Sequence, residues 1–202
     1  MNTYQSPVQQ FLTSEFDSQG STLAEEPELT SQFLLSRLFT KLAQLNLEFG
    51  KHMMTTKQEY DFSKFLGIFL QYLRRAISLD NNNTSAFYHR SKIMIQLYRK
   101  REELNHTIPS ENRKPNEYYN QLMDDLGKLV QSPSIEYKKF ALYNRAVIGF
   151  KRGEYQQVVE DLSIYLSHSE PSDEQHDRAV RLKRNALLKQ GRYLAWIQDA
   201  LS

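Results

Sequence analysis

Apolar residues recur at three- and four-residue steps through most of the chain, and this spacing predicts helices. Between residues 140 and 166 two such segments are joined by Lys-Arg-Gly-Glu-Tyr at 151–155. A cationic pair favours a helix C-terminus, glycine favours the left-handed turn after it, and Glu154 suits the start of the next helix. We therefore expect an antiparallel helical hairpin over residues 135–168.

The same periodicity recurs on both sides of this hairpin. We expect further hairpins at residues 31–79, 84–131 and 174–202. Gly191 repeats the turn of Gly153 after 38 residues, and all six prolines lie outside the predicted helix interiors. The sequence thus predicts an all-α domain over residues 30–202. Residues 1–29 offer too few apolar side chains to offset the entropy of ordering, and we expect a flexible acidic tail there.

Capping residues and breakers set the expected helix boundaries. Thr30 or Ser31 starts the first helix and Gly50 closes it, and a second helix follows over 57–79. The third helix starts at Thr84 and carries cations at 99–101 near its C-terminal end, which they suit. Residues 106–115, with two prolines, are expected to form an exposed loop. The remaining helices are expected at about 116–130, 174–190 and 194–201, besides the two of the central hairpin.

The order of residue types in the central hairpin resembles one tetratricopeptide repeat. Its features are a small residue at Ala146, Gly-x-Tyr from Gly153 to Tyr155, apolar residues at 158–159 and Pro171 beyond. The resemblance is clearest over residues 140–202 and 75–98. It implies a right-handed superhelix of about four antiparallel hairpins. Heptad-type bundle packing is the alternative for the first 80 residues, and the 55 residues from Arg90 to Arg145 exceed the family's period of about 34.

In this family the first helix of each hairpin lines a concave groove, whose inward positions meet the ligand. The corresponding positions here are Tyr88, His89, Lys92, Tyr143, Asn144, Lys151, Arg178, Arg181, Asn185 and Lys189. Cations bind carboxylates by charge-assisted hydrogen bonds, and tyrosines give rigid contact area, so the resemblance implies an acidic or extended peptide as ligand. Exposed helix faces also carry such cations without any ligand, and Tyr88 or Tyr143 can instead pack between repeats.

Charge is divided unevenly along the chain. The net charge is +2, but residues 1–36 hold five acidic residues and no Lys or Arg, which leaves 26 basic and 19 acidic residues in the remainder. An acidic tail therefore precedes a basic body. Residues 1–29 are thus also candidates to occupy the groove themselves, because a tethered segment acts at a high effective concentration.

These observations favour a non-catalytic protein-interaction module, acting as an adaptor, a co-chaperone or a complex subunit. The alternatives are an RNA-binding helical-repeat protein, given the basic clusters, and a regulatory helical domain of a larger enzyme. One subset of the family grips the C-terminal carboxylate of heat-shock chaperones. Asn144 fits that pattern and Arg178 replaces its lysine, whereas Tyr88, Lys92 and Leu182 depart from it.

No pattern in the sequence indicates catalysis. There is no cysteine, the five histidines lack metal-ligand spacing, and the seven glycines are scattered singly, so we expect neither metal nor cofactor. The adjacent acids Asp124 and Asp125 point about 100° apart on a helix and are expected on a solvated face. No export signal or membrane span is evident, and we expect a soluble intracellular protein, in the cytoplasm or also in the nucleus.

Overall fold

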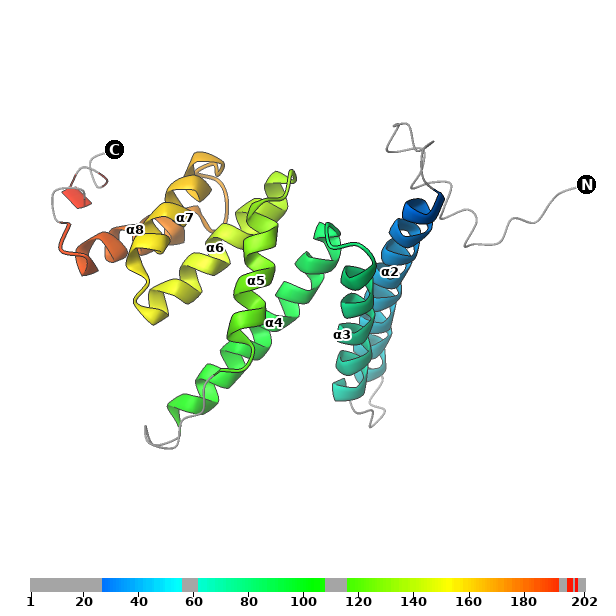
Figure 1. Cartoon of the computed structure of the whole chain (residues 1–202). Coiled ribbons are helices and arrows are strands. Elements are labelled where there is room, and N and C mark those ends of the chain that lie inside the picture. The colour runs from blue at the N-terminus through cyan, green and yellow to red at the C-terminus, as the bar shows by residue number, and fades with distance from the viewer. Residues whose placement is uncertain (1–26, 56–61, 108–115, 193–195, 198, 200–202) are drawn as a thin grey trace, which may run out of the picture.

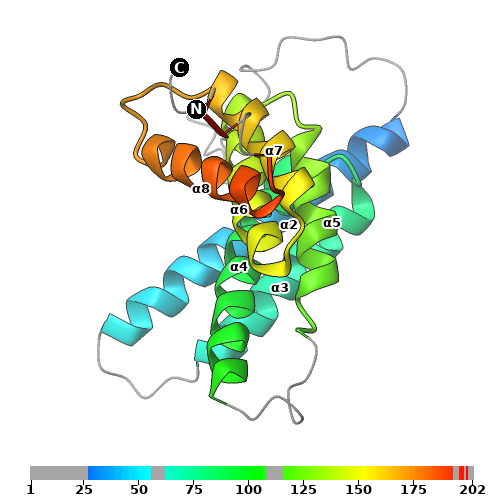
Figure 2. The same ribbon diagram turned by 90° about the vertical axis from the view of Figure 1, so that its left-hand side faces the viewer.

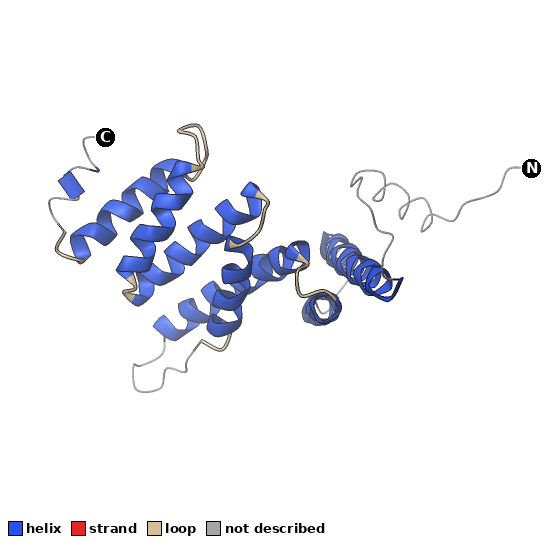
Figure 3. Ribbon diagram, turned by 45° about the horizontal axis from the view of Figure 1, so that its top comes forward, coloured by secondary structure: helices blue, strands red, loops and turns tan. Residues whose placement is uncertain are grey.

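The computed structural model describes residues 27–55, 62–107, 116–192, 196–197 and 199. Regular structure in these ranges is helical throughout, without a strand (Figure 3), which confirms the all-α prediction for them. The helices are α2 (Pro27–Thr55), α3 (Phe62–Leu79), α4 (Thr84–His106), α5 (Tyr119–Val130), α6 (Ile135–Arg152), α7 (Tyr155–Ser167) and α8 (His176–Lys189). The tail predicted at 1–29 falls almost wholly outside the described residues.

The helices form an elongated array in which each packs against its neighbour in the chain (Figure 1). The pairs α2–α3, α4–α5 and α6–α7 are antiparallel, and α8 packs against α7. In addition α4 contacts α6, and α6 contacts α8. The hairpin α2–α3 lies at one end of the array and α8 at the other. Figure 2 views the array from the α8 end. The first helices of successive hairpins are therefore neighbours.

Three apolar cores lie along the array, and each is closed by the first helix of the following hairpin. The first holds Phe69 and Leu73 of α3 and is closed by Ala86 of α4. The second lies between α4 and α5 and takes in two residues of α6. The third holds Val158 and Leu162 of α7 and includes two alanines of α8. Small residues on α4, α6 and α8 let these helices approach closely.

Local sequence explains the sharpest helix boundaries. Ser134 caps α6 by accepting a hydrogen bond from the Tyr137 backbone N–H, and Asn83 caps α4 in the same way. Gly153 ends α6 with a φ of 80°, and Gly191 follows α8 with a φ of 71°. Such left-handed conformations disfavour residues with a Cβ, so the predicted role of both glycines holds.

The predicted boundaries of the first helix are wrong. Helix α2 begins at Pro27, inside the expected tail, and it continues through Gly50, which does not end it. Helix α3 is described from Phe62, and the start predicted at residue 57 lies outside the described residues. Helix α4 ends at His106, within one residue of the predicted boundary, and Arg99 lies about two turns before that end. A glycine within a helix costs only about 1 kcal/mol relative to alanine, which packing against a neighbouring helix readily offsets.

A polar junction attaches α2 to the rest of the array. The side-chain nitrogen of Asn83 donates to the hydroxyls of Ser36 (2.8 Å) and Thr40 (3.0 Å), and the Ser36 hydroxyl donates to the Ala76 carbonyl oxygen. Asn83 is fully buried, so these hydrogen bonds are needed to satisfy its amide. One residue thus caps α4 and fixes the position of α2.

A buried ion pair joins the two helices of each of two hairpins. Arg90 on α4 donates to both carboxylate oxygens of Asp125 on α5, at 2.7 and 2.6 Å. Arg145 on α6 pairs in the same bidentate geometry with Asp161 on α7, at 2.8 and 2.6 Å. Asp125 is 1% exposed, so its expected place on a solvated face is wrong; Asp124 beside it is exposed.

A related pair follows at the end of the array. The Nζ atom of Lys183 on α8 lies 2.5 Å from Oδ1 of Asp199. Sixteen positions of sequence separate these two residues, as they separate Arg145 from Asp161. Of the helix predicted over 194–201, residues 196, 197 and 199 are described and are helical. The cation-to-aspartate link therefore recurs in three successive units.

Candidate partner-binding groove

A groove of about 440 Å³ crosses the face that α4, α6 and α8 share. Its walls combine cationic, aromatic and carboxamide side chains, and its floor includes one residue of α7. The lining residues are Arg99, Lys139, Phe140, Tyr143, Asn144, Tyr165, Gln175 and Arg178. Three first helices thus contribute to one concave surface.

Helix α6 supplies half of the lining because four of its residues share one face. Lys139, Phe140, Tyr143 and Asn144 are spaced by one, three and one residues, which places them on adjoining turns. The Asn144 side chain donates to the Phe140 carbonyl oxygen at 2.8 Å, and this bond fixes its orientation. The Tyr143 ring lies 5.6 Å from the buried Tyr165 ring of α7. The aromatic part of the groove is therefore packed against α7.

The charges in the groove are only partly compensated. Lys139 is paired with Asp173, and the hydrogen bond from Lys139 holds the pKa of that carboxyl below its usual value. Arg99 and Arg178 are exposed, and within the described part of the chain neither makes an ion pair. The groove therefore keeps two guanidinium groups for an external anion.

Two uncharged groups add hydrogen-bonding capacity. Burial raises the pKa of Tyr165, with a contribution from Asp173, so this phenol stays protonated at neutral pH. The side-chain oxygen of Gln175 is buried and accepts no hydrogen bond from any described residue. A buried acceptor without a partner is uncommon in proteins, and an N–H donor of a ligand would satisfy it.

The structure brings three of the ten predicted site residues together in this groove, namely Tyr143, Asn144 and Arg178. Two others take part in packing. The Tyr88 ring stacks on Tyr137 at 4.6 Å and meets Phe140 edge-on at 4.8 Å, so it fills the space between α4 and α6. His89 is half-buried beside Gln44 of α2, and burial, together with Lys92 and Lys41, lowers its pKa.

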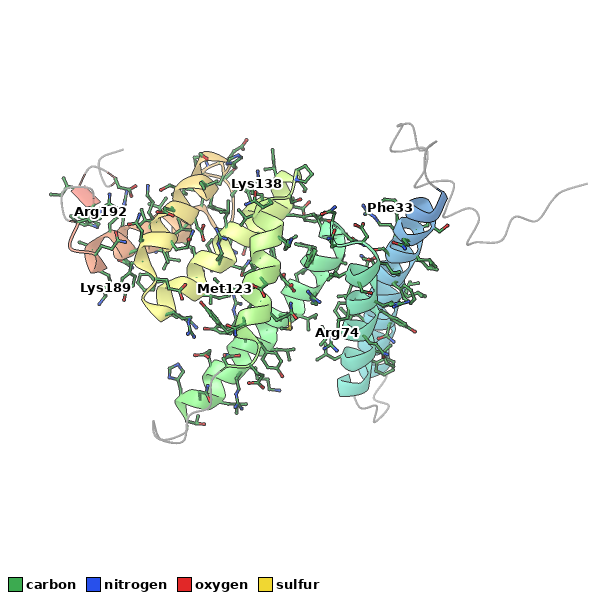
Figure 4. The ribbon with its side chains drawn as sticks, viewed as in Figure 1. Phe33, Arg74, Met123, Lys138, Lys189 and Arg192 are labelled. Carbon is green, nitrogen blue, oxygen red and sulfur yellow. The ribbon has the colours of Figure 1, made fainter. Side chains whose placement is uncertain are left out.

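The other five predicted residues are exposed and lie outside the groove lining. Lys92 stands over the Tyr88 ring, with its nitrogen 5.2 Å from the ring centroid. The Arg181 guanidinium donates to the Asp177 carbonyl oxygen of its own helix. The set is Lys92, Lys151, Arg181, Asn185 and Lys189. Figure 4 places Lys189 near Arg192 at the end of α8, far along the array from Arg74 on α3.

Five lining residues were missed by the sequence prediction: Arg99, Lys139, Phe140, Tyr165 and Gln175. Lys139 and Phe140 precede the predicted Tyr143 by one helical turn. That spacing places them on the same helix face as Tyr143 and could have identified them as lining residues. Arg99 was assigned to a helix end. The positions of Tyr165 and Gln175 depend on how α7 and α8 pack against α6.

Neither a metal cluster nor a membrane-crossing helix is found among the residues that the structure describes. Comparison of the chain with family models, with curated proteins and with solved structures gives no match. The resemblance to tetratricopeptide repeats therefore remains a prediction from the residues quoted above.

Proposed function

We propose that this chain is a non-catalytic protein-interaction module that holds an acidic or extended segment of a partner protein in the groove across α4, α6 and α8. The groove carries the proposal. It brings together two guanidinium groups and a side-chain acceptor for which the described residues provide neither a counter-charge nor a donor, beside an aromatic wall. A peptide with a carboxylate, apolar groups and backbone N–H groups matches all three features.

We further propose that the array is a right-handed superhelix of the tetratricopeptide type. The supporting features are the left-handed glycines after α6 and α8, the close approach of first helices, and the recurring cation-to-aspartate link. In such an array stability comes from neighbour contacts, and curvature creates an extended binding surface. An adaptor, a co-chaperone or a complex subunit would use that surface.

Charge separation along the chain supports an acidic ligand and suggests regulation by the tail. Residues 1–29 carry five acids and no base, and 1–26 lie outside the described residues. If this segment competes for the groove, its removal increases the affinity for an acidic peptide. The absence of cysteine agrees with a reducing compartment, and we propose the cytoplasm, with the nucleus as a second location.

A charge-reversal pair tests the groove directly. Arg99→Glu with Arg178→Glu reverses the two unpaired guanidiniums of the groove. Arg74→Glu with Arg75→Glu is the matched control, because both residues are exposed on α3 outside the groove lining. The readouts are proximity labelling in cells and binding of a fluorescein-labelled peptide of alternating Glu and Tyr, measured by anisotropy.

The groove variant is expected to label few of the partners that the wild type labels, and its affinity for the peptide should fall at least tenfold, about 1.4 kcal/mol. The control variant should keep the wild-type labelling and the wild-type affinity. Circular dichroism verifies that each variant is folded. Equal recovery from the two variants would place the binding surface elsewhere.

A further inference from the structure

Two guanidiniums facing one groove offer more positive charge than a single carboxylate neutralises. The protein itself provides the comparison: Asp125 is matched by the one guanidinium of Arg90, and Asp161 by that of Arg145, each through two hydrogen bonds. One bidentate arginine therefore suffices for a carboxylate in these pairs. The groove presents Arg99 and Arg178, and neither pairs with a carboxylate in the described part of the chain.

We propose that the group bound between Arg99 and Arg178 is the phosphoryl group of a phosphorylated peptide side chain. This inference rests on the proposed function and specifies its ligand. A phosphate monoester carries a charge of about −1.5 to −2 at pH 7 and three acceptor oxygens, so it can bind both guanidinium groups at once. A carboxylate carries a charge of −1 and has two acceptor oxygens.

The rest of the groove fits the peptide around such a group. Phe140 and Tyr143 supply an apolar wall beside the cations. The buried oxygen of Gln175 accepts from a ligand backbone N–H, because no described residue donates to it. Lys139 stays paired with Asp173, which keeps this carboxylate from repelling the ligand. The phosphoryl group thus sets affinity, and the carboxamide fixes the direction of the chain.

The volume of the groove is compatible with a phosphoryl group on an aliphatic side chain, serine or threonine, and with one on tyrosine. About 440 Å³ accommodates a phosphoserine or phosphothreonine with its neighbours, and also the ring of a phosphotyrosine against Tyr143. The phosphoryl group is common to both, and the experiment separates them.

The test uses fluorescein-labelled octapeptide pools with acidic random flanks and one fixed central residue: phosphoserine, phosphothreonine, phosphotyrosine, glutamate or serine. The full chain is titrated by anisotropy. At least one phosphorylated pool is expected to bind ten times more tightly than the glutamate pool. This advantage should shrink as pH falls from 7.5 to 5.5, because the second phosphate pKa is about 6 and glutamate stays ionised.

Arg99→Gln with Arg178→Gln should abolish the difference between the phosphorylated and glutamate pools. Lys151→Gln with Lys189→Gln removes the same charge from exposed positions outside the groove lining and should preserve it. Thermal unfolding of both variants establishes that they remain folded.

The failures are distinguishable. Equal binding of the phosphorylated and glutamate pools, both weakened by the groove variant, overturns the phosphoryl assignment and leaves the proposed function standing. No binding of any pool overturns both. A phosphopeptide preference that survives in the groove variant places the site elsewhere. Tighter binding of a 5′-phosphorylated RNA octamer than of every peptide pool overturns the assignment to a peptide.

Discussion

Replacing Arg90 by methionine leaves a carboxylate inside the protein without its counter-charge. Asp125 is 1% exposed and receives two hydrogen bonds from Arg90, at 2.7 and 2.6 Å. Its remaining side-chain hydrogen bond comes from Gln121 at 3.2 Å. Methionine keeps much of the aliphatic volume of arginine, so the substitution isolates the loss of charge and of donors.

Removing one partner of a buried ion pair costs about 3–5 kcal/mol, because the other charge stays buried and uncompensated. For a chain of this length, 1 kcal/mol shifts the melting temperature by about 2–4 °C, so we expect a decrease of roughly 6–20 °C. Replacing both partners, Arg90→Met with Asp125→Leu, should recover most of the loss, since a well-packed apolar pair avoids desolvation altogether. Lys100→Met, an exposed change on the same helix, should cost less than about 0.5 kcal/mol.

The pH dependence gives an independent measurement. Burial raises the pKa of Asp125, and hydrogen bonds from Arg90 and Gln121 lower it only in part. The folded protein therefore binds the proton more tightly than the unfolded chain, and the cost of burying the carboxylate fades as pH falls through the folded pKa. Without Arg90 the folded pKa rises further. Urea unfolding followed by circular dichroism should thus show the penalty of Arg90→Met shrinking from pH 7 toward pH 4.

A penalty below 1 kcal/mol at pH 7, or one that grows on acidification, would refute this reasoning. Either result would mean that Asp125 reaches water or that another cation replaces Arg90. A double variant as unstable as the single variant would show that the pair, and not the isolated charge, supplies the stability.

Three further predictions concern the array itself. Gly153→Ala should lower the free energy of unfolding by about 1–2 kcal/mol, because it places a Cβ at a φ of 80°. Gly67→Ala within α3 should raise it by about 0.5–1 kcal/mol, because the added Cβ would meet nothing within 4 Å. Urea unfolding compares the two variants. Asn83→Ala removes a cap and two buried hydrogen bonds, so roughly 1–3 kcal/mol should be lost and limited proteolysis should release α2–α3 first. The lowered pKa of His89 means that its stabilisation is present above pH 6.5 and is lost as pH falls through the folded pKa. The protection factors of α2 amides, which correct for the intrinsic exchange rate, should therefore be lower at pH 5.5 than at pH 7.5, and His89→Gln should remove this difference.

The turns at Gly153 and Gly191 were predictable because a left-handed residue is a local requirement that one amino acid meets best. The extent of α2 was not predictable from the sequence in this way. Its continuation through Gly50 depends on packing against α3, and a single glycine has too small a helix penalty to decide the matter.

At the candidate site, some positions follow from helical spacing in the sequence, and others depend on how distant helices pack together. Helical spacing correctly separated Asp124 from Asp125 by about 100°, but it did not identify Arg90, thirty-five positions away, as the partner of the buried Asp125. Arg99 was predicted from its charge to stabilise a helix C-terminus, but it lies about two turns before the end of α4 and lines the groove. Tyr88 satisfied the predicted pattern for a ligand contact, but its ring packs on Tyr137.

Chemical-shift mapping tests the central claim most directly. The ¹⁵N-labelled chain is titrated with the acidic Glu-Tyr peptide and with the phosphorylated octapeptide pools, and the shifted backbone amides are placed on the structure. Our account predicts that the largest shifts fall around Arg99, Tyr143, Asn144 and Arg178, with α2 and α3 unaffected. Shifts confined to α2–α3, or to the face opposite the groove, would contradict it.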